Sequence, residues 1–268
     1  MKTIFGFIGC GNMGGTLAES VAKTVLGEQI MVCDTVFEKA ERLAMSCGMQ
    51  VTDLISLVKS SQYIFIGVKP QGAAKLFDTI RPILQKRKDP FVLISMLAGT
   101  SIAALTELAG CKCPIIRIMP NTPASVGEGM ILYDYNSAVS EEQLSEFTNA
   151  FSEAGRLDHL PEASIDAASA LSGCGPAFVF LFAEALADAG VECGLKREQA
   201  NLYAAQTLLG SAKLLLESGK HPGVLKDAVC SPGGTTIAGI HALEEGGFRA
   251  AAINAVTAAY EKTLKLKG

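Results

Sequence analysis

The chain up to Met119 alternates short β-rich runs with helical stretches, and this alternation limits its fold more than any other feature. The runs consist mainly of Ile, Val and Phe with little polar alternation, which is typical of parallel strands buried on both faces. The pattern predicts a parallel sheet with right-handed crossovers, that is, a doubly wound α/β domain. The expected strands are Thr3–Gly9, Gln29–Asp34, Gln62–Val68, Pro90–Met96 and Pro114–Met119, with helices near 14–25, 36–47, 71–84 and 101–109.

The composition changes at about Pro161. After this point no run has strand character, and Ala, Leu, Glu and Lys dominate. Gly- and Pro-containing breaks divide the segment into about five helices. We therefore expect two domains, a dinucleotide-binding domain at 1–160 and a helical substrate-binding and dimerisation domain at 161–268.

The segment Ala177–Ala189 is apolar on nearly all sides. Such a helix must be surrounded by protein, and one small helical domain supplies too little of it. Because hydrophobic residues make up 49% of the chain, we expect a homodimer through the C-terminal helices, with a higher oligomer of dimers left open. The uncharged stretch 167–183 is interrupted by Gly173, Gly175 and Pro176 and is short for a membrane span, which favours a buried helix over a membrane protein.

Charge, the N-terminal sequence and cysteine content argue against a nucleic-acid-binding, a secreted or a metal-binding protein. The net charge is −4 with no basic cluster, so no nucleic-acid partner is expected. The N-terminus lacks the features of a secretory leader, which predicts a cytoplasmic protein. The eight cysteines are scattered and form no metal-ligand cluster with the three histidines, so we expect reduced, buried thiols and no metal.

The residues Gly9-Cys10-Gly11-Asn12-Met13-Gly14 match G-x-G-x-x-G directly after the first expected strand. Asp34 ends the second strand, where an acidic residue can bind a ribose 2′-OH. Gly9 permits the tight turn, Gly11 allows close approach of a pyrophosphate, and Gly14 lets the helix pack closely. This context favours a Rossmann-type dinucleotide site over the alternative of a plain tight turn.

Later strand ends fall on the same edge of the sheet, where ligands bind in open α/β folds. Lys69 and Pro70 follow one strand, and Gly99 follows the next. The alternative interpretation of Lys69 is a solvated lysine at the end of a strand, with no role in cofactor binding. Asn121 lies between two prolines in a rigid loop that could aim its amide at a ligand, and the alternative is a surface turn.

The segment Cys230–Thr236, CSPGGTT, joins two helices and offers successive amides with three hydroxyls. Such a loop can form an anion-binding nest suited to a carboxylate. The alternative is a helix–helix turn without a ligand. Another small-residue break, Leu171–Ala177, interrupts the preceding helical region.

Together these segments resemble the pyrroline-5-carboxylate reductase family. The matching elements are FIGCGNMG, VKPQ, SMLAGTSI, RIMPNTPASVGEG, ALSGCGPAFVF, ALADAGVECGL and HPGVLKDAVCSPGGTTIAGIHALE, and they span residues 4 to about 258. The resemblance implies a Rossmann domain, a helical domain interlocked with a second subunit, and NAD(P)H-dependent reduction of a cyclic imine to L-proline.

The resemblance also implies site residues. Those at the cofactor would be Ile8, Gly9, Cys10, Gly11, Asn12, Met13, Gly14, Asp34, Thr35, Gly67, Val68, Lys69, Pro70, Ala98, Gly99 and Asn121. Those at the substrate would be Val229, Ser231, Gly234, Thr235, Thr236 and Glu162, with Thr236 as the catalytic hydrogen-bonding group. Glu162 has the alternative of a first-turn residue that complements the dipole of its helix.

Cofactor choice is open. The sequence departs from the family at Cys33-Asp34-Thr35, where many members carry Asn, Arg or Ser and bind the 2′-phosphate of NADPH. Asp34 favours NADH, whereas Thr35 with Lys39 or Arg42 would favour NADPH. Two rival interpretations remain. One is a β-hydroxyacid dehydrogenase, a family whose pattern includes a catalytic Lys early in the second domain; residues 162–195 contain no Lys. The other is a non-catalytic dinucleotide-binding protein, which would not need the CSPGGTT loop.

Overall fold

The computed structural model describes residues 4–267. Thr3, the first residue of the first expected strand, lies outside them. The strands are β1 (Phe5–Ile8), β2 (Ile30–Cys33), β3 (Gln50–Val51), β4 (Tyr63–Ile66), β5 (Val92–Ser95), β6 (Ile115–Met119), β7 (Gly129–Tyr135) and β8 (Gly155–His159). The helices are α1 (Asn12–Val21), α2 (Phe37–Cys47), α3 (Leu54–Ser60), α4 (Pro70–Leu84), α5 (Ile102–Ala109), α6 (Glu141–Ala150), α7 (Glu162–Ser172), α8 (Gly175–Glu192), α9 (Arg197–Ser218), α10 (Pro222–Ala228), α11 (Thr235–Glu245) and α12 (Phe248–Lys267).

The strands form one sheet in the order β3-β2-β1-β4-β5-β6-β7-β8. Every pair is parallel except β6 with β7, which is antiparallel. The first six positions have the order of a Rossmann sheet, in which the chain reverses direction across the sheet between β1 and β4. The expected doubly wound parallel domain is therefore confirmed.

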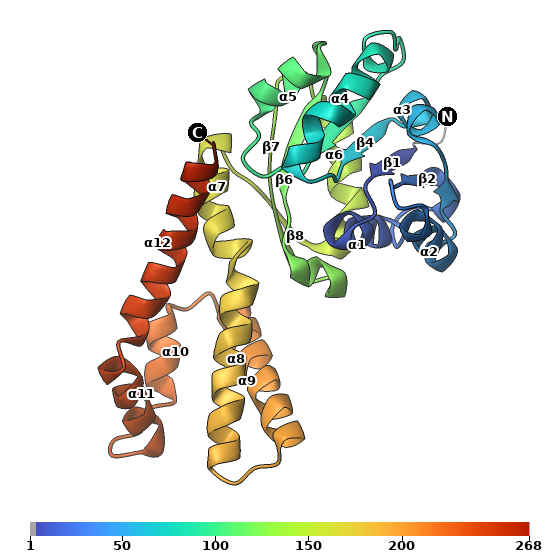
Figure 1. The fold of residues 1–268 in the computed structure, drawn as a ribbon. Helices are drawn as coiled ribbons and strands as arrows, with labels where there is room; N and C mark the ends of the chain where they lie inside the picture. The colour runs from blue at the N-terminus through green and yellow to red at the C-terminus, as the bar shows by residue number, and fades with distance from the viewer. Residues whose placement is uncertain (1–3, 268) are drawn as a thin grey trace. The chain divides into compact units, whose positions relative to one another are not determined.

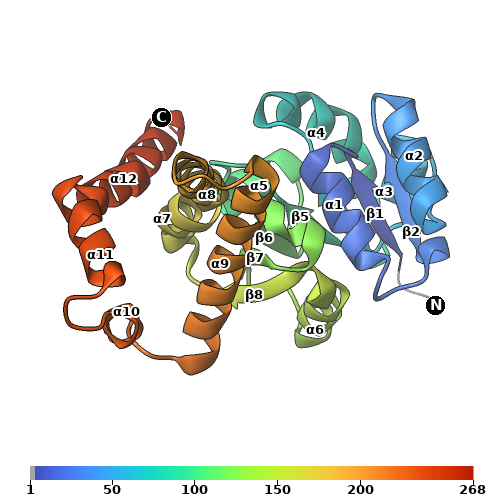
Figure 2. The ribbon, with the colours of Figure 1, turned by 90° about the horizontal axis from the view of Figure 1, so that it is seen from below.

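Helices cover both faces of this sheet (Figures 1 and 2). On one face α1, α2 and α6 pack on the strands, and the core there includes Phe65 and Phe151. On the other face α3, α4 and α5 bury Phe77 and Leu105. Because β1, β2, β4 and β5 are covered on both sides, they consist almost entirely of apolar residues, as the sequence indicates.

The chain divides into two compact units. The first consists of the residues up to Gly173 together with those from Tyr260 onward, and the second is Cys174–Ala259. In the second unit α8 and α9 pack side by side as a helical hairpin (Figure 1). The domain boundary expected between residues 160 and 161 stays a prediction. In the structure α7 contacts β7 and is part of the first compact unit.

Several elements were not expected from the sequence. The strands β3, β7 and β8 and the helices α3 and α6 are absent from the predicted pattern. α6 carries a capping box in which Ser140 and Gln143 each bond the other's backbone, a signal that was present in the sequence. Beyond His159 the described residues contain helices and no strand, as expected.

The second unit buries very little of its own apolar surface. Its hydrophobic cluster consists of Ala187, Ala200 and Ala204, with Val191 packed against it. On α8, Phe180 is 65% exposed and Leu181 is 68% exposed. By length and composition the helical segment Glu162–Glu192 could cross a membrane, and 11% of its most apolar window is buried in the chain. The expected buried helix is thus not covered within one chain.

Candidate active site

The glycine motif forms the turn between β1 and α1. Gly9 has φ +100°, and a Cβ atom there would lie 2.6 Å from the Gly67 carbonyl oxygen. A Cβ at Gly14 would lie 2.1 Å from the Gly9 carbonyl oxygen, so only glycine lets α1 pack against the turn. A Cβ at Gly11, the N-cap of α1, would meet nothing within 4 Å. The open space at Gly11 lies over the N-terminus of a helix, where a phosphate group fits.

Asp34 ties this turn to the end of β2. Its Oδ2 accepts a hydrogen bond from the Cys10 amide at 2.7 Å, and its Oδ1 accepts one from the Val36 amide at 2.8 Å. Asp34 is partly exposed and lines a pocket with Thr35 and Lys39. Thr35 Oγ1 also donates to Oδ1, at 3.5 Å. Oδ2 keeps a second lone pair, so the side chain can still accept a bond from a ribose hydroxyl.

The pocket has a volume of about 940 Å³ and runs along the carboxyl ends of β1, β2 and β4. Eight of the expected cofactor residues line it: Ile8, Gly9, Gly11, Asp34, Thr35, Gly67, Val68 and Lys69. Further lining residues, not identified from the sequence, include Phe37, Val51, Asp53, Leu54, Lys75, Leu76 and Thr79. They come from β3 and from helices whose packing on the sheet cannot be derived from a local motif.

The remaining cofactor candidates do not line this pocket. Asn12, Met13 and Gly14 form the first turn of α1, and Pro70 is the first residue of α4 after its N-cap Lys69. Ala98 and Gly99 lie in the loop between β5 and α5, where Gly99 has φ +72°. All of these positions follow carboxyl ends of strands in the Rossmann order, which is the edge that binds dinucleotides.

Asn121 has partners within the protein. Its Nδ2 donates to the Ser172 carbonyl oxygen at 2.9 Å, and its Oδ1 accepts from the Met130 amide at 2.8 Å. The side chain is 8% exposed. Asn121 therefore links the end of β6 to the start of β7 and the end of α7, rather than lying in a surface turn.

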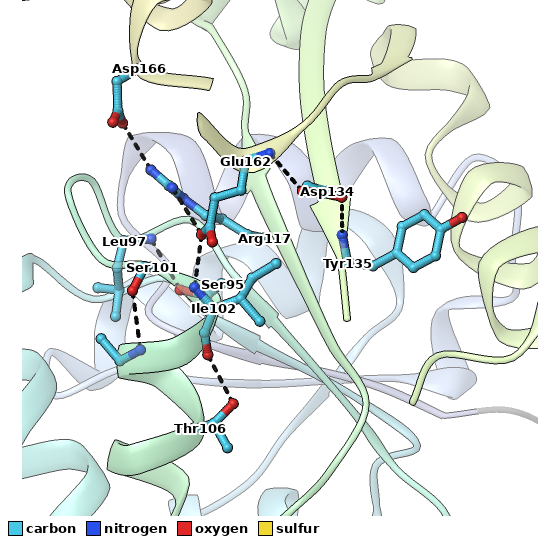
Figure 3. A network of polar contacts seen from close by, with 11 residues as sticks. Ser95, Leu97, Ser101, Ile102, Thr106, Arg117, Asp134, Tyr135, Glu162 and Asp166 are labelled. Carbon is cyan, nitrogen blue, oxygen red and sulfur yellow. Dashed lines mark hydrogen bonds and ion pairs between the residues drawn. The ribbon is translucent and has the colours of Figure 1, made fainter. Parts of the chain in front are cut away.

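Glu162 belongs to a polar network that the sequence did not indicate (Figure 3). Its Oε1 accepts from Arg117 Nη1 at 3.0 Å and from the Ile102 amide at 2.7 Å. Arg117 is 1% exposed, and its Nη2 donates to Asp166 Oδ1 at 2.9 Å. The one available signal was the charge of Arg117 within the otherwise apolar run Ile115–Met119.

The CSPGGTT segment forms a turn followed by a helix. The Gly234 amide donates to the Ser231 carbonyl oxygen at 3.0 Å, and Gly233 has φ +68°. A proline and a glycine between these residues are typical of a type II turn. Gly234 is the N-cap of α11, Thr235 and Thr236 are exposed in its first turn, and Val229 is the C-cap of α10. The first amides of α11 lack a side-chain cap at Gly234.

A second hollow of about 560 Å³ lies beside this turn. It is lined by Gly233, Gly234, Ile237, Ala238, Ile240, His241 and Glu244. The two glycines belong to the turn before α11, and the other five residues lie on α11 itself. Neither Thr235 nor Thr236 lines it, although the glycines of the turn do.

The cysteines are all free thiols. Burial raises the pKa of Cys10 to about 12, with a further contribution from the charge of Asp34, and burial is also the main cause that raises the pKa of Cys33 to about 12. Both thiols beside the glycine motif are therefore protonated near neutral pH. The expectation of burial is wrong for Cys174 and Cys193, which are exposed on the chain. Within residues 4–267 no group of His, Cys, Asp and Glu side chains is placed to hold a metal ion.

Comparison with known proteins agrees with this architecture. Residues 162–266 match the family model described as pyrroline-5-carboxylate reductase dimerisation, and residues 4–99 match the one described as NADP oxidoreductase coenzyme F420-dependent. The chain is 41% identical to pyrroline-5-carboxylate reductase of Arabidopsis thaliana, over 97% of this chain and 94% of the relative.

Solved structures give the same result. The pyrroline-5-carboxylate reductase of Coxiella burnetii has a TM-score of 0.90 at 31% identity and covers 100% of both chains. The pyrroline carboxylate reductase of Plasmodium falciparum with NADP bound has a TM-score of 0.86 at 32% identity, covering 100% of this chain and 99% of that one. With full-length similarity in both sequence and structure, this chain belongs to the pyrroline-5-carboxylate reductase family.

Proposed function

We propose that this protein reduces 1-pyrroline-5-carboxylate to L-proline with NADPH or NADH, as the last step of proline biosynthesis in the cytoplasm. The observation that carries the proposal is the 41% identity to a reductase of that name over 97% of this chain. The dinucleotide pocket and the glycine loop before α11 supply the two binding functions that this reaction needs.

The proposal is tested by following NAD(P)H oxidation with pyrroline-5-carboxylate as substrate and proline as the product measured. NAD reduction with 3-hydroxyisobutyrate is the control for a β-hydroxyacid dehydrogenase. Turnover in the control reaction alone would contradict the proposal. Binding of NAD(P)H without turnover of either substrate would instead indicate a non-catalytic dinucleotide-binding protein.

The cofactor is proposed to lie across the carboxyl ends of β1 and β4. The open space over Gly11 and the 940 Å³ pocket fit a dinucleotide: a pyrophosphate there would meet the amides of the first turn of α1. Asp34 and Thr35 would then bind the adenosine ribose, and Gly67 to Pro70 would line the middle of the cofactor. Ala98 and Gly99 would lie beside the nicotinamide half, with Asn121 supporting the end of β6.

NAD(P)H, when bound, would supply a hydride to C5 of the pyrroline ring, and the C=N electron pair would move onto the nitrogen of that ring. The residues of the chain have to hold the substrate carboxylate, orient the ring and help to keep its nitrogen protonated. We propose that the amides around Gly234, Thr235 and Thr236 bind the carboxylate, with Val229 and Ser231 shaping the loop. The Thr236 hydroxyl is too weak an acid to protonate the nitrogen alone, so it orients the ring and relays a proton by a hydrogen bond.

Cofactor choice is expected to lean toward NADH, with efficiency comparable to or better than that with NADPH. The 2′-phosphate of NADPH would place a second negative charge close to the Asp34 carboxylate, which is unfavourable unless a cation intervenes. Lys39 lines the pocket and could do so, whereas Arg42 does not line it. The measurement is kcat/KM for both cofactors in the wild type and in Asp34→Ser, with Asp34→Asn to keep one acceptor oxygen for the glycine turn.

Lys39→Gln tests the opposite possibility, and Arg42→Gln is its matched control on the same helix outside the pocket. If Lys39 receives a 2′-phosphate, only Lys39→Gln lowers NADPH efficiency. A wild-type preference for NADPH above about tenfold, or 1.4 kcal/mol, that Asp34→Ser leaves unchanged would show that Asp34 does not discriminate between the cofactors.

The protein is expected to be at least a dimer assembled through the helices of residues 163–268. Apolar side chains of α8 are exposed, and the buried core of the second unit is a small cluster of three alanines. Obligate interfaces of this kind bury more than about 2,000 Å² and are strongly hydrophobic. Sedimentation should give at least twice the 28.1 kDa chain mass, and Leu181→Glu on α8 should lower it.

Met45→Glu is the matched control, since Met45 on α2 is 81% exposed in the first unit and should not affect association. A wild-type mass of one chain in dilute solution, with activity retained, would refute the expected dimer.

A further inference from the structure

Phe37 is a large apolar side chain that the fold leaves uncovered. It is the first residue of α2, it is 57% exposed, and it belongs to neither hydrophobic core of the first unit. A single exposed apolar side chain is ordinary on a protein surface. Phe37 differs because it lines the 940 Å³ pocket, and among the described residues that do so it is the one aromatic side chain.

Asp34 fixes the turn that carries Phe37. Its Oδ1 accepts the amide hydrogen of Val36, the N-cap of α2, at 2.8 Å, and its Oδ2 accepts that of Cys10 at 2.7 Å. The Lys39 amide donates to the Val36 carbonyl oxygen at 3.0 Å and closes the first turn of the helix. The backbone of Phe37 is therefore held next to Asp34, the residue proposed to bind the adenosine ribose.

The same pocket has an apolar wall from the other face of the sheet. α2 packs on one face of the sheet, whereas α3 and α4 pack on the other. Leu54, the first residue of α3, lines the pocket together with Leu76 on α4 and Val51 on β3. Because α2 and α3 both begin at the carboxyl edge of the sheet, Phe37 and Leu54 reach the pocket from its two faces. A flat apolar group fits between such walls.

The polar side chains at this end of the pocket do not form a directed set of hydrogen-bonding groups. Asp53 Oδ1 accepts the Ser56 amide at 2.9 Å and its Oδ2 accepts the Ser56 hydroxyl at 2.6 Å, so this carboxylate caps α3. Thr52 and Thr79 carry hydroxyls, which accept hydrogen bonds as well as donate them. A hydroxyl therefore does not distinguish an amino group from a carbonyl group on the edge of a base.

We propose that the Phe37 ring stacks on the purine base of the dinucleotide, and that the pocket recognises this base by its face rather than by its edge. The inference rests on the proposed function for the identity of the ligand. In a dinucleotide the base is attached to the ribose beside the 2′-hydroxyl, so a ribose at Asp34 brings the base to the start of α2. Stacking on an aromatic side chain is tolerant of base identity, because every base has a π-face.

Phe37→Ala is expected to weaken NADH binding about tenfold through the loss of base stacking. Binding is measured on the full chain by titration of NADH fluorescence. The displacement of NADH by 5′-AMP, which carries the base without the nicotinamide, should weaken by the same factor. Phe37→Tyr keeps the ring and should stay within about threefold of wild type, whereas Phe37→Leu keeps only an apolar side chain and should lose at least about fivefold.

Val36→Ala is the matched control. Val36 is the neighbouring exposed apolar side chain, it does not line the pocket, and its amide remains in the variant. Its NADH affinity should change less than about twofold, which is below the effect of a lost stacking contact. Wild-type affinity for NADH and 5′-AMP in Phe37→Ala, or in Phe37→Leu, would overturn the proposal. So would a Phe37→Ala protein that unfolds at a lower urea concentration in the absence of cofactor, because that would show a structural role.

The hypoxanthine analogue of NADH tests recognition by the face of the base. It replaces the amino group of adenine with a carbonyl, and the wild type should bind it within about threefold of NADH. An analogue bound more than about tenfold more weakly would show that the edge is read, and would overturn that part of the proposal.

Sedimentation separates the proposal from a contact between subunits. If Phe37→Ala lowers the mass of the assembly and leaves cofactor affinity unchanged, a second subunit covers Phe37 and the proposal is wrong. The proposed function can fail independently, since a wild type that binds NADH without reducing pyrroline-5-carboxylate would refute that function alone. The affinities of the Phe37 variants would still decide the role of the ring.

Discussion

Thr236→Ala is expected to lower kcat by about tenfold to a thousandfold while leaving the fold intact, as for the loss of one catalytic hydrogen bond. Thr236 is exposed in the first turn of α11, directly after the Ser231–Gly234 turn. Because its side chain is exposed on the chain, the substitution is not expected to change the free energy of unfolding. The measurement is steady-state kcat and KM with saturating NAD(P)H.

Thr236→Ser restores the hydroxyl and should recover most of the rate. Thr207→Ala is the matched control, because Thr207 is also exposed on a helix of the second unit and bonds only the Tyr203 carbonyl of its own helix. Near-wild-type turnover in purified Thr236→Ala would exclude the proposed role.

Arg117→Ala is expected to destabilise the first unit by about 3–5 kcal/mol, because it leaves the buried Asp166 carboxylate without the Arg117 cation. Arg117 is 1% exposed, and the Asp166 side chain that it binds is 4% exposed. The loss is measured as the change in the free energy of unfolding in urea. Hydrogen exchange of the β6 and α7 amides would show where protection is lost.

Asp78→Ala supplies the comparison on the same unit. Asp78 pairs with Arg81 on α4 at 4.0 Å and its side chain is 74% exposed. Exposed pairs of this kind contribute about 0–1 kcal/mol. A loss in Arg117→Ala no larger than that in Asp78→Ala would mean that the buried network does not hold α7 on the sheet.

The strands of the first half were predictable because their signal is local. A strand buried on both faces is mostly apolar, so β1, β2, β4, β5 and β6 are visible as runs rich in Ile, Val and Phe, with Arg117 in β6 as a charged exception. In contrast, β7 carries Tyr133, Asp134 and Tyr135, and β8 carries charged residues. Their pairing at the edge of the sheet depends on strands distant in sequence, and no local pattern indicates it.

The glycine motif was interpretable for the same reason. Gly9, Gly11 and Gly14 each satisfy a steric need within one turn of chain, and Asp34 lies at the end of the next strand. Apart from Lys39, the members of the pocket contributed by β3, α2 and α4 were not identified, because they approach the motif only when the sheet forms. The CSPGGTT turn was visible as a proline–glycine pattern, and its conformation follows from the left-handed φ at Gly233.

The sequence by itself determined the Rossmann half, the helical half, the glycine turns and the family, since each depends on short-range periodicity or on residues that only one backbone conformation accepts. Only the tertiary structure decided what Glu162 binds. Its partners are Arg117 and Ile102, 45 and 60 residues away. They meet because β5 and β6 are neighbours in the sheet and α7 returns to pack on β7. Long-range polar contacts follow from the order of the strands, and a chain read in one dimension does not contain that order.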